Sequence, residues 1–312
     1  MQFFRNLQIC GLYLISVYFF ASLSACGGGA SNAASVAGGI NTSANTTPTT
    51  PLQITPVPTT PIPTTPTWKL VWSDEFDGTG LPDANKWGYD TSRNAAGWFN
   101  NELQYYARNR LENSRVENGK LTITARKERL TSAADYGNQA YTSARLVTRG
   151  IASWTYGFFE VRAKLPCGAG TWPAIWTLGT KGAWPADGEI DIMEQLGNNK
   201  TEVLGTIHTQ ANNYFNGTQG IGLGGKVVVA DSCTNFHNYQ LTWTADEIAI
   251  GIDDVPYFVY KNPKNGNYAQ WPFDNPQYLI LNLAVGGDLG GAVPANFSSQ
   301  QMEVDYVRAY QR

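Results

Sequence analysis

Residues 188–197 read GEIDIMEQLG and place three carboxylates, Glu189, Asp191 and Glu194, in a largely apolar run. Because a buried carboxylate is costly unless chemistry or a partner retains it, this stretch is the first candidate for a functional site. On a β-strand Glu189 and Asp191 share one face, whereas Glu194 falls on the opposite one. A β-bulge around Met193 would return Glu194 to the face of the other two acids. Taken alone, the stretch could also be a polar strand edge or a cation site.

Apolar side chains alternate with polar ones in several other stretches. Residues 121–125, 159–165 and 248–252 each place an apolar side chain at every second position. Each is therefore predicted to be a strand with one buried face. Glycines and Asn/Asp clusters separate these stretches, and no long stretch keeps the period of 3.6 residues that a helix requires. The pattern predicts an all-β fold, a β-sandwich or jelly roll, without internal repeats.

The composition narrows the class of protein. The chain has 312 residues, 42% of them hydrophobic and 15% charged, and its formal net charge of −3 argues against a nucleic-acid partner. Ten Trp, sixteen Tyr and thirteen Phe, together with many glycines, favour β-structure. Tryptophan faces left exposed in a groove would suit the flat apolar faces of sugar rings.

Residues 1–25 have the pattern of a secretory signal. A basic residue is followed by an apolar run over 9–20, which is too short and wrongly flanked to be a stable membrane span. The ending LSAC at 23–26 resembles a bacterial lipobox, in which Cys26 is lipidated; an ordinary cleaved signal with a chance cysteine is the alternative. Because Gly27 follows instead of Asp, we expect an exported lipoprotein anchored at the outer membrane or cell surface.

Residues 26–67 contain no charged side chain and consist mainly of Gly, Ala, Ser, Asn, Thr and Pro. Such a segment cannot bury enough apolar surface to fold, so we expect a disordered tether. The folded domain is expected over 68–312, as a monomer. Within it Cys167 and Cys233 remain as a pair, and an exported compartment favours a disulfide between them, with two buried free thiols as the alternative.

Two carboxylates on one face of a groove can cleave a glycosidic bond, because one attacks the anomeric carbon while the other protonates the leaving oxygen. Retention of configuration requires the two carboxyls to lie about 5 to 5.5 Å apart. Glu189 and Glu194 can approach that separation if the bulge exists. Asp191 between them would hold their proton affinities apart, so that one glutamate stays ionised and the other protonated.

The pattern E-I-D-x-x-E at 189–194 resembles the active strand of glycoside hydrolase family 16 in its bulged, laminarinase-like form. Members without the extra residue, such as lichenases, read E-x-D-x-E, so Met193 separates the two forms. The resemblance covers almost all of 68–312. Further matching stretches are WSDEFDG at 72–78, NNELQYY at 100–106, YTSARLVT at 141–148, LPCGAGTWPAIWTLG at 165–179, GTIHTQ at 205–210, FHNYQLTW at 236–243, LILNLAVGG at 279–287 and MEVDYVRAYQ at 302–311.

This resemblance implies a curved jelly roll whose concave face binds a β-glucan, and retaining endo-hydrolysis of β-1,3-glucosidic bonds in laminarin-type or mixed-linkage glucans. It implies no cofactor for catalysis. Carried over by residue, Glu189 is the nucleophile, Asp191 its helper, and Glu194 the general acid and then base. His208 matches a histidine on the neighbouring strand, although a histidine of this kind is more often structural.

The resemblance also implies a set of cleft residues. Trp172 and Trp176 share a strand face and match positions that stack on sugars. The alternative is that these tryptophans are buried in the core of the jelly roll. Arg145 matches an arginine that hydrogen-bonds substrate, with charge balance beside the acids as the alternative. The remaining positions expected in the cleft are Trp98, Asn101 and Trp184. Leu289 departs from the family pattern, because many laminarinase-like members carry a tryptophan there.

A structural Ca²⁺ site is implied by Glu75, the backbone carbonyl of Gly119 and Asp305, which occupy the positions of the family's convex-face calcium ligands. Oxygen ligands from distant chain segments suit Ca²⁺, and its role would be to clamp the two ends of the domain together. A simple salt bridge or solvated acids would explain the same residues.

Two other functions remain open from the sequence. Enzymes that cleave agar- or carrageenan-type galactans share the bulged motif, so its spacing does not exclude them. A non-catalytic lectin would use the cleft only to bind glycan, and the absence of one of the glutamates would indicate such a protein. This chain has all three acids. The stretches WPAIWTLG, GEIDIMEQLG and NNELQYY are similar to those of laminarinases, so the sequence favours a glucan hydrolase.

Overall fold

The computed structural model describes residues 68–213 and 223–312. The predicted signal peptide, the lipidation site at Cys26 and the tether over 26–67 lie outside the described residues. Within the described part of the chain, no helix has the length and apolar character needed to cross a membrane. The single helix found there is α1 (Gly287–Gly290), which agrees with the absence of a helical period in the sequence.

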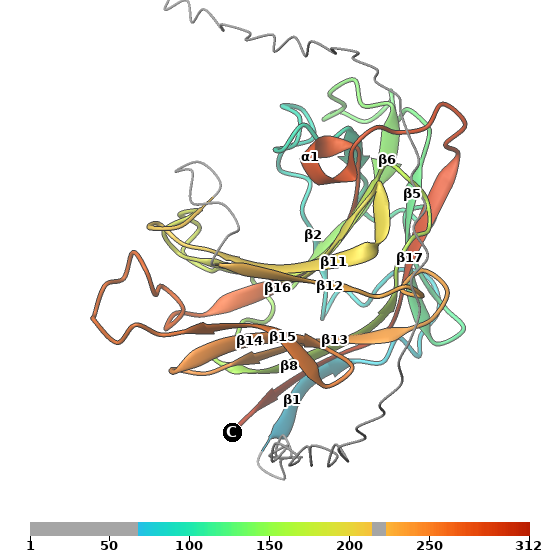
Figure 1. Ribbon diagram of the computed structural model, residues 1–312. Coiled ribbons are helices and arrows are strands. Elements are labelled where there is room, and N and C mark those ends of the chain that lie inside the picture. Colours follow the sequence, from blue (N-terminus) through green and yellow to red (C-terminus); the bar gives the residue numbers. More distant parts are fainter. Residues whose placement is uncertain (1–67, 214–222) are drawn as a thin grey trace, which may run out of the picture. The chain divides into compact units, whose positions relative to one another are not determined.

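The described residues form two β-sheets, stacked as layers in Figure 1. One sheet has seven strands in the order β12-β11-β10-β9-β16-β7-β2. Their bounds are β2 (Gly88–Tyr89), β7 (Arg145–Val147), β9 (Thr171–Gly179), β10 (Glu189–Leu196), β11 (Asn199–His208), β12 (Gly224–Val228) and β16 (Gln277–Val285). The helix α1 lies on the side of this sheet that faces away from the second one (Figure 1).

The second sheet has ten strands, in the order β15-β14-β13-β8-β17-β5-β6-β3 with β1 paired to β17 and β4 paired to β5. Their bounds are β1 (Lys69–Asp74), β3 (Gln104–Tyr106), β4 (Ser114–Glu117), β5 (Lys120–Arg126), β6 (Tyr141–Ser143), β8 (Gly157–Lys164), β13 (His237–Trp243), β14 (Glu247–Ile252), β15 (Val255–Lys261) and β17 (Ser299–Gln311). The predicted all-β jelly-roll architecture is confirmed.

The main core fills the space between the sheets. Strand β8 alternates buried and half-buried residues, and its Phe159, Val161 and Ala163 are at most 2% exposed. This is the side-chain period of two that the sequence predicts for a strand with one buried face. Strand β16 is buried at all nine positions, because it lies inside the sheet with the core on one face and the cleft on the other. Its apolar run LILNLAV reflects that double burial.

The register of β10 confirms the predicted bulge. Between Asp191 and Glu194 the pairing with β11 shifts, and the pairing with β9 shifts between Asp191 and Met193. Ile192 and Met193 are both fully buried, so two consecutive side chains point into the core. Glu194 therefore returns to the face of Asp191. Gly205 of β11 lies across from the bulge, on the core side of the sheet. A Cβ atom there would lie only 2.6 Å from the hydroxyl of Tyr257, so the packing leaves no room for a side chain.

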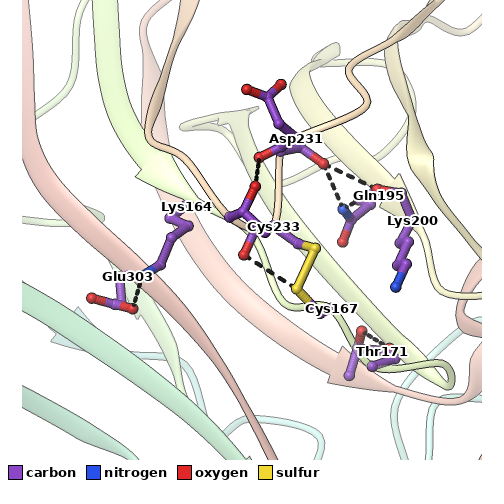
Figure 2. Close-up of a disulfide and its surroundings, with 11 residues drawn as sticks. Lys164, Cys167, Thr171, Gln195, Lys200, Asp231, Cys233 and Glu303 are labelled. Carbon is purple, nitrogen blue, oxygen red and sulfur yellow. Dashed lines mark hydrogen bonds and ion pairs between the residues drawn. A yellow bond between two sulfur atoms is a disulfide. The ribbon is translucent and has the colours of Figure 1, made fainter.

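A disulfide joins Cys167 to Cys233, with their Cα atoms 5.1 Å apart, as the exported compartment predicts (Figure 2). Cys167 lies in the connection from β8 to β9, and Cys233 in the connection from β12 to β13, so the bridge spans the seam between the two sheets. Ser232 accepts a hydrogen bond from Gln195 of β10 at 3.2 Å, which ties this seam to the strand that carries the acids. A disulfide closing a loop of this size stabilises a fold by about 2 to 4 kcal/mol.

Candidate active site

A cavity of about 460 Å³ opens on the face of the seven-stranded sheet opposite the core. Alternate residues of β9, β10 and β11 form its floor, and the loops over 97–102 and 180–188 with α1 form its walls. Glu189, Asp191 and Glu194 all line this cavity, because the bulge aligns them.

Each of the three acids accepts a hydrogen bond from a different neighbouring element. The indole N–H of Trp184 donates to Glu189 Oε2, and that of Trp172 donates to Glu194 Oε1 at 2.9 Å. The hydroxyl of Thr206 donates to Asp191 Oδ2 at 2.5 Å. These three bonds orient the carboxylates from β9, β11 and the loop before β10, so the cluster is positioned from three sides.

His208 supplies positive charge to the acids. It pairs with Glu189 in the β10–β11 register, and its Nε2 lies 3.4 Å from Asp191 Oδ2. Burial would lower the pKa of His208, but the hydrogen bond and charge of Asp191 outweigh burial and raise the pKa to about 9. The imidazole is therefore protonated at neutral pH, and the sequence-based placement of His208 beside the acids agrees with the structure.

Burial and crowding change the protonation of the two glutamates. Burial and the negative charge of Asp191 raise the pKa of Glu194 to about 8, although His208 and the Trp172 N–H partly oppose them. The same two causes raise the pKa of Glu189 well above its usual value, against His208 and the Trp184 N–H. Asp191 therefore raises the proton affinity of both glutamates and does not separate them as the sequence led us to expect. Glu194 retains its proton at neutral pH, which is the condition that general-acid catalysis by a carboxyl group requires.

Aromatic rings continue the cleft from β10 towards β7. The guanidinium of Arg145 lies between the rings of Trp98 and Trp176, 5.1 and 4.6 Å from their centroids. Its Nε also lies 3.3 Å from a carboxylate oxygen of Asp90, so charge balance applies to this arginine, and its contact with substrate stays a prediction. The Trp176 N–H donates to Asn282 Oδ1 at 2.7 Å, which sets the orientation of its ring.

The predicted cleft residues divide into two groups. All of the predicted tryptophans, with Arg145 and His208, line the cavity. Asn101 does not lie in the cavity wall. Its side-chain amide donates to Asp288 Oδ1 of α1 at 2.7 Å, so it joins the loop over 97–102 to α1.

Two residues with clear roles at the site were not predicted. Thr206 binds Asp191 and lies two positions before His208, so the strand period of two around GTIHTQ was the signal that could have found it. Asn282 binds Trp176 and is the one amide within the apolar stretch LILNLAV, which is the kind of buried polar residue that indicates a partner.

Comparison with known proteins agrees with this geometry. The family model for glycosyl hydrolases family 16 matches residues 101–308, which is more than half of the chain and includes the whole acidic cluster. The chain belongs to glycosyl hydrolase family 16. A beta-glucanase of Rhodothermus marinus is 51% identical over 254 residues, covering 78% of this chain and 85% of that protein.

Solved family 16 structures share the fold. A non-specific endo-beta-1,3(4)-glucanase superposes with a TM-score of 0.75 at 57% identity, covering 78% of this chain and 91% of that one. A serine variant of the same enzyme, co-crystallised with 1,3-beta-D-cellotriosyl-glucose, presents 1,3-beta-D-cellobiosyl-glucose at its active site, with a TM-score of 0.76, 55% identity, and coverage of 80% and 96%. The chain is therefore a glycoside hydrolase of a family for which a retaining mechanism is typical and no cofactor is needed.

The residues predicted to hold Ca²⁺ converge on one part of β17. Val307 pairs with Asp74, the residue before Glu75, and Val304 pairs with Leu121 near Gly119. The donor types suit Ca²⁺, but guanidinium groups already hold both carboxylates. Arg308 binds Glu75 through two hydrogen bonds of 3.0 and 2.8 Å, and Arg162 Nη1 lies 2.6 Å from Asp305 Oδ2. A cation at this position would have to replace these pairs in part.

Proposed function

We propose that this enzyme cleaves internal β-1,3-glucosidic bonds in laminarin-type or mixed-linkage β-glucans, with retention of configuration. The observation that carries the proposal is the bulge of β10, which puts Glu189 and Glu194 on one face beside Asp191, in a cleft floored by tryptophans. The names of similar proteins support the choice of substrate, since they describe a beta-glucanase and an endo-beta-1,3(4)-glucanase.

In the first step, a carboxylate oxygen of Glu189 forms a bond to the anomeric carbon while the glycosidic C–O bond breaks. The proton of Glu194 passes to the leaving oxygen. In the second step, Glu194 takes a proton from a water molecule, whose oxygen bonds to the same carbon and releases Glu189. Two inversions give overall retention, and the chemistry uses side chains of this chain alone.

Asp191 and His208 adjust the proton affinities of the two glutamates. The charge of Asp191 favours a protonated Glu194, and His208 favours ionised carboxylates. The charge of His208 acts directly on both glutamates, and its contact with Asp191 holds it beside them. The roles of nucleophile for Glu189 and of acid and base for Glu194 follow the family motif.

Substrate binding would depend on the tryptophan faces and on Arg145. Trp172 and Trp176 stand on the cleft face of β9 with Ala174 between them, and both line the cavity. Flat aromatic faces pack against the apolar faces of glucosyl rings, while the guanidinium of Arg145 donates to hydroxyls. An open cleft of this kind accepts the middle of a polymer, which supports endo cleavage.

A substrate panel tests the proposal. Laminarin, lichenan, barley glucan, agarose and carrageenan are each incubated with the enzyme, and the products are sized. We expect cleavage of laminarin and of the mixed-linkage glucans. Cleavage restricted to agarose or carrageenan would assign the cleft to a galactan instead, and binding of glucan without cleavage would favour the lectin. The anomer first released, followed by NMR, should be the β form, whereas initial release of the α form would contradict retention.

For localisation, we propose that Cys26 carries a lipid that anchors the enzyme at the outer membrane or cell surface, and that the enzyme acts as a monomer. The lipobox pattern at 23–26 and the uncharged segment after it support the anchor. Fractionation of cells expressing the full chain tests it, because Cys26→Ser should move the enzyme from the membrane to the soluble fraction. An unchanged distribution would contradict the anchor.

The calcium site stays a prediction. If Glu75, the Gly119 carbonyl and Asp305 bind Ca²⁺, addition of EDTA lowers the melting temperature and Ca²⁺ restores it, with little change in activity at mild temperature. An unchanged melting temperature would mean that the pairs with Arg308 and Arg162 join the chain ends without a metal ion.

A further inference from the structure

Phe99 is an exposed aromatic residue at the wall of the cleft. Its side chain is 62% exposed, the highest exposure among the aromatic residues that line the cavity. Single exposed apolar side chains are ordinary on protein surfaces and by themselves indicate no function. Phe99 differs because it lies in the same cavity as Trp98, Arg145 and Trp176, which already form a line of flat groups.

The ring of Phe99 is supported from one side. The guanidinium of Arg93 lies 4.6 Å from the ring centroid, which is the geometry of a cation–π contact. Arg93 is itself held, because its Nε donates to the carbonyl of Gly97 at 3.3 Å. One ring face is therefore covered by a positive charge, and the high exposure of the residue leaves the other face open to a ligand.

The loop that carries Phe99 is attached to the cleft wall. The carbonyl of Phe99 accepts from Glu102 N at 3.1 Å, and the carbonyl of Asn100 accepts from Asp288 N of α1 at 2.9 Å. The neighbouring residue of α1 that lines the cavity, Leu289, has no aromatic face to offer. A ring held by these contacts loses little conformational freedom on binding, which favours recognition of a flat ligand.

The neighbours of Phe99 belong to the side of the cleft formed by β7 and β2. Trp98, its neighbour, packs against Arg145 of β7, and three strand spacings of about 4.8 Å separate β7 from β10. Arg93, under the ring, belongs to the connection after β2, the outermost strand on that side. A glycan chain that runs from the acids across β9 and β16 towards β7 would pass Trp176 and Arg145 before it reaches the loop of Phe99.

We propose that Phe99 is a stacking platform for a further sugar unit of the glycan chain, and that it determines the preferred chain length of the enzyme. The inference rests on the proposed glucanase function and extends it. The apolar C–H face of a pyranose ring packs on the open face of Phe99, while Arg93 fixes the ring from behind. Short oligosaccharides do not reach this platform, so its contribution depends on length.

A ladder of β-1,3-gluco-oligosaccharides from trimer to octamer tests the proposal through kcat/KM at each length. We expect Phe99→Ala to lower kcat/KM about two- to tenfold for the longer chains, mainly through KM, because aromatic contacts have this magnitude. Phe99→Trp should preserve the wild-type length dependence. Val259→Ala, which removes an exposed apolar side chain from β15 in the other sheet, is the matched control and should change nothing.

Two results would overturn the proposal. An equal loss at every length would indicate that Phe99 acts on the structure of the loop, and no loss at any length would remove the platform. If the wild-type enzyme cleaves none of this ladder, the proposed substrate is wrong. The same length comparison is then made on oligosaccharides of the glycan that the enzyme does cleave, and the same two results decide the role of Phe99.

Discussion

Carboxylates occur on the outer faces of both sheets, and their surroundings differ. In the cleft, Glu189, Asp191 and Glu194 are crowded together and share His208 as a positively charged neighbour. On the outer face of the ten-stranded sheet, Glu75 and Glu303 form ion pairs with arginine or lysine side chains. Glu75 lies 2.8 Å from Arg308, and Glu303 lies 2.6 Å from both Lys120 and Lys164.

The pKa values move in opposite directions in the two regions. Burial and Asp191 raise the pKa of Glu194 to about 8, whereas the hydrogen bond from Arg308 lowers the pKa of Glu75. For Glu303, burial would raise the pKa, but Lys120 and Lys164 outweigh it and the pKa is lowered. Acids on the outer sheet therefore stabilise the fold, while acids in the cleft cost stability and are retained for chemistry.

The largest expected effect comes from removing one acid of the cleft. Glu189→Ala should lower kcat on glucan by about 10⁴-fold or more, which is the scale seen when one member of a cooperating catalytic set is lost. Glucan binding should persist, because the tryptophans and Arg145 remain. Steady-state kinetics and affinity electrophoresis measure the two quantities, and a variant that turns over normally would refute the assignment.

The second effect concerns the shared cation. Since Glu194 acts as the acid, activity of the wild type should fall about tenfold per pH unit above about pH 8. Near pH 8 His208 is still positively charged, because its pKa is raised to about 9, and it favours the ionised carboxylate and so lowers the pKa of Glu194. His208→Gln should therefore move the alkaline limb of the kcat/KM profile to higher pH. A limb that stays in place or moves down would contradict the electrostatic role of His208.

The third expected effect is a pH dependence of the free energy of unfolding that is caused by Glu194. Folding raises the pKa of Glu194 from 4.5 to about 8, so between these values the folded state holds a proton that the unfolded state has lost. The free energy of unfolding contributed by this group therefore falls as pH rises through that window. Glu194→Gln removes this pH-dependent fall in the free energy of unfolding. The melting temperature of the variant minus that of the wild type should therefore increase between pH 5 and 8. Melting curves that keep a constant offset over this range would show that Glu194 costs no stability.

The smallest effect is expected on the outer sheet. Glu75→Gln breaks the pair with Arg308, whose side chains are 36% and 33% exposed, so solvent screening limits its contribution to about 0.2 to 1 kcal/mol. The melting temperature should fall by at most about 4 °C, and kcat/KM should not change. Because the pKa of Glu75 is lowered by folding, the difference from wild type should vanish as pH falls below the usual glutamate range. A loss of activity in this variant would contradict the conclusion that acids on the outer sheet serve stability and acids in the cleft serve catalysis.

Much of the site could be predicted because it depends on a count of residues along one strand. The parity of Glu189, Asp191 and Glu194, with one residue too many, indicated a bulge if the three acids share one face, and the register shows that bulge. Partners that come from distant loops could not be predicted in this way. The sequence contains no local signal that Asn101 bonds to Asp288, because the two are 187 residues apart and meet through loop packing.

The sequence by itself predicted the strand periods, the bulge and an all-β sandwich or jelly roll, and it favoured a disulfide between Cys167 and Cys233 over two free thiols. These follow from local side-chain alternation and from the small number of cysteines, so neighbouring residues suffice to state them. The tertiary structure alone decided which indole binds which glutamate, that acids on one sheet lack the cations found on the other, and that Phe99 lies open in the cleft. These depend on loops and strands brought together by burial of the common core, and no local pattern records those distances.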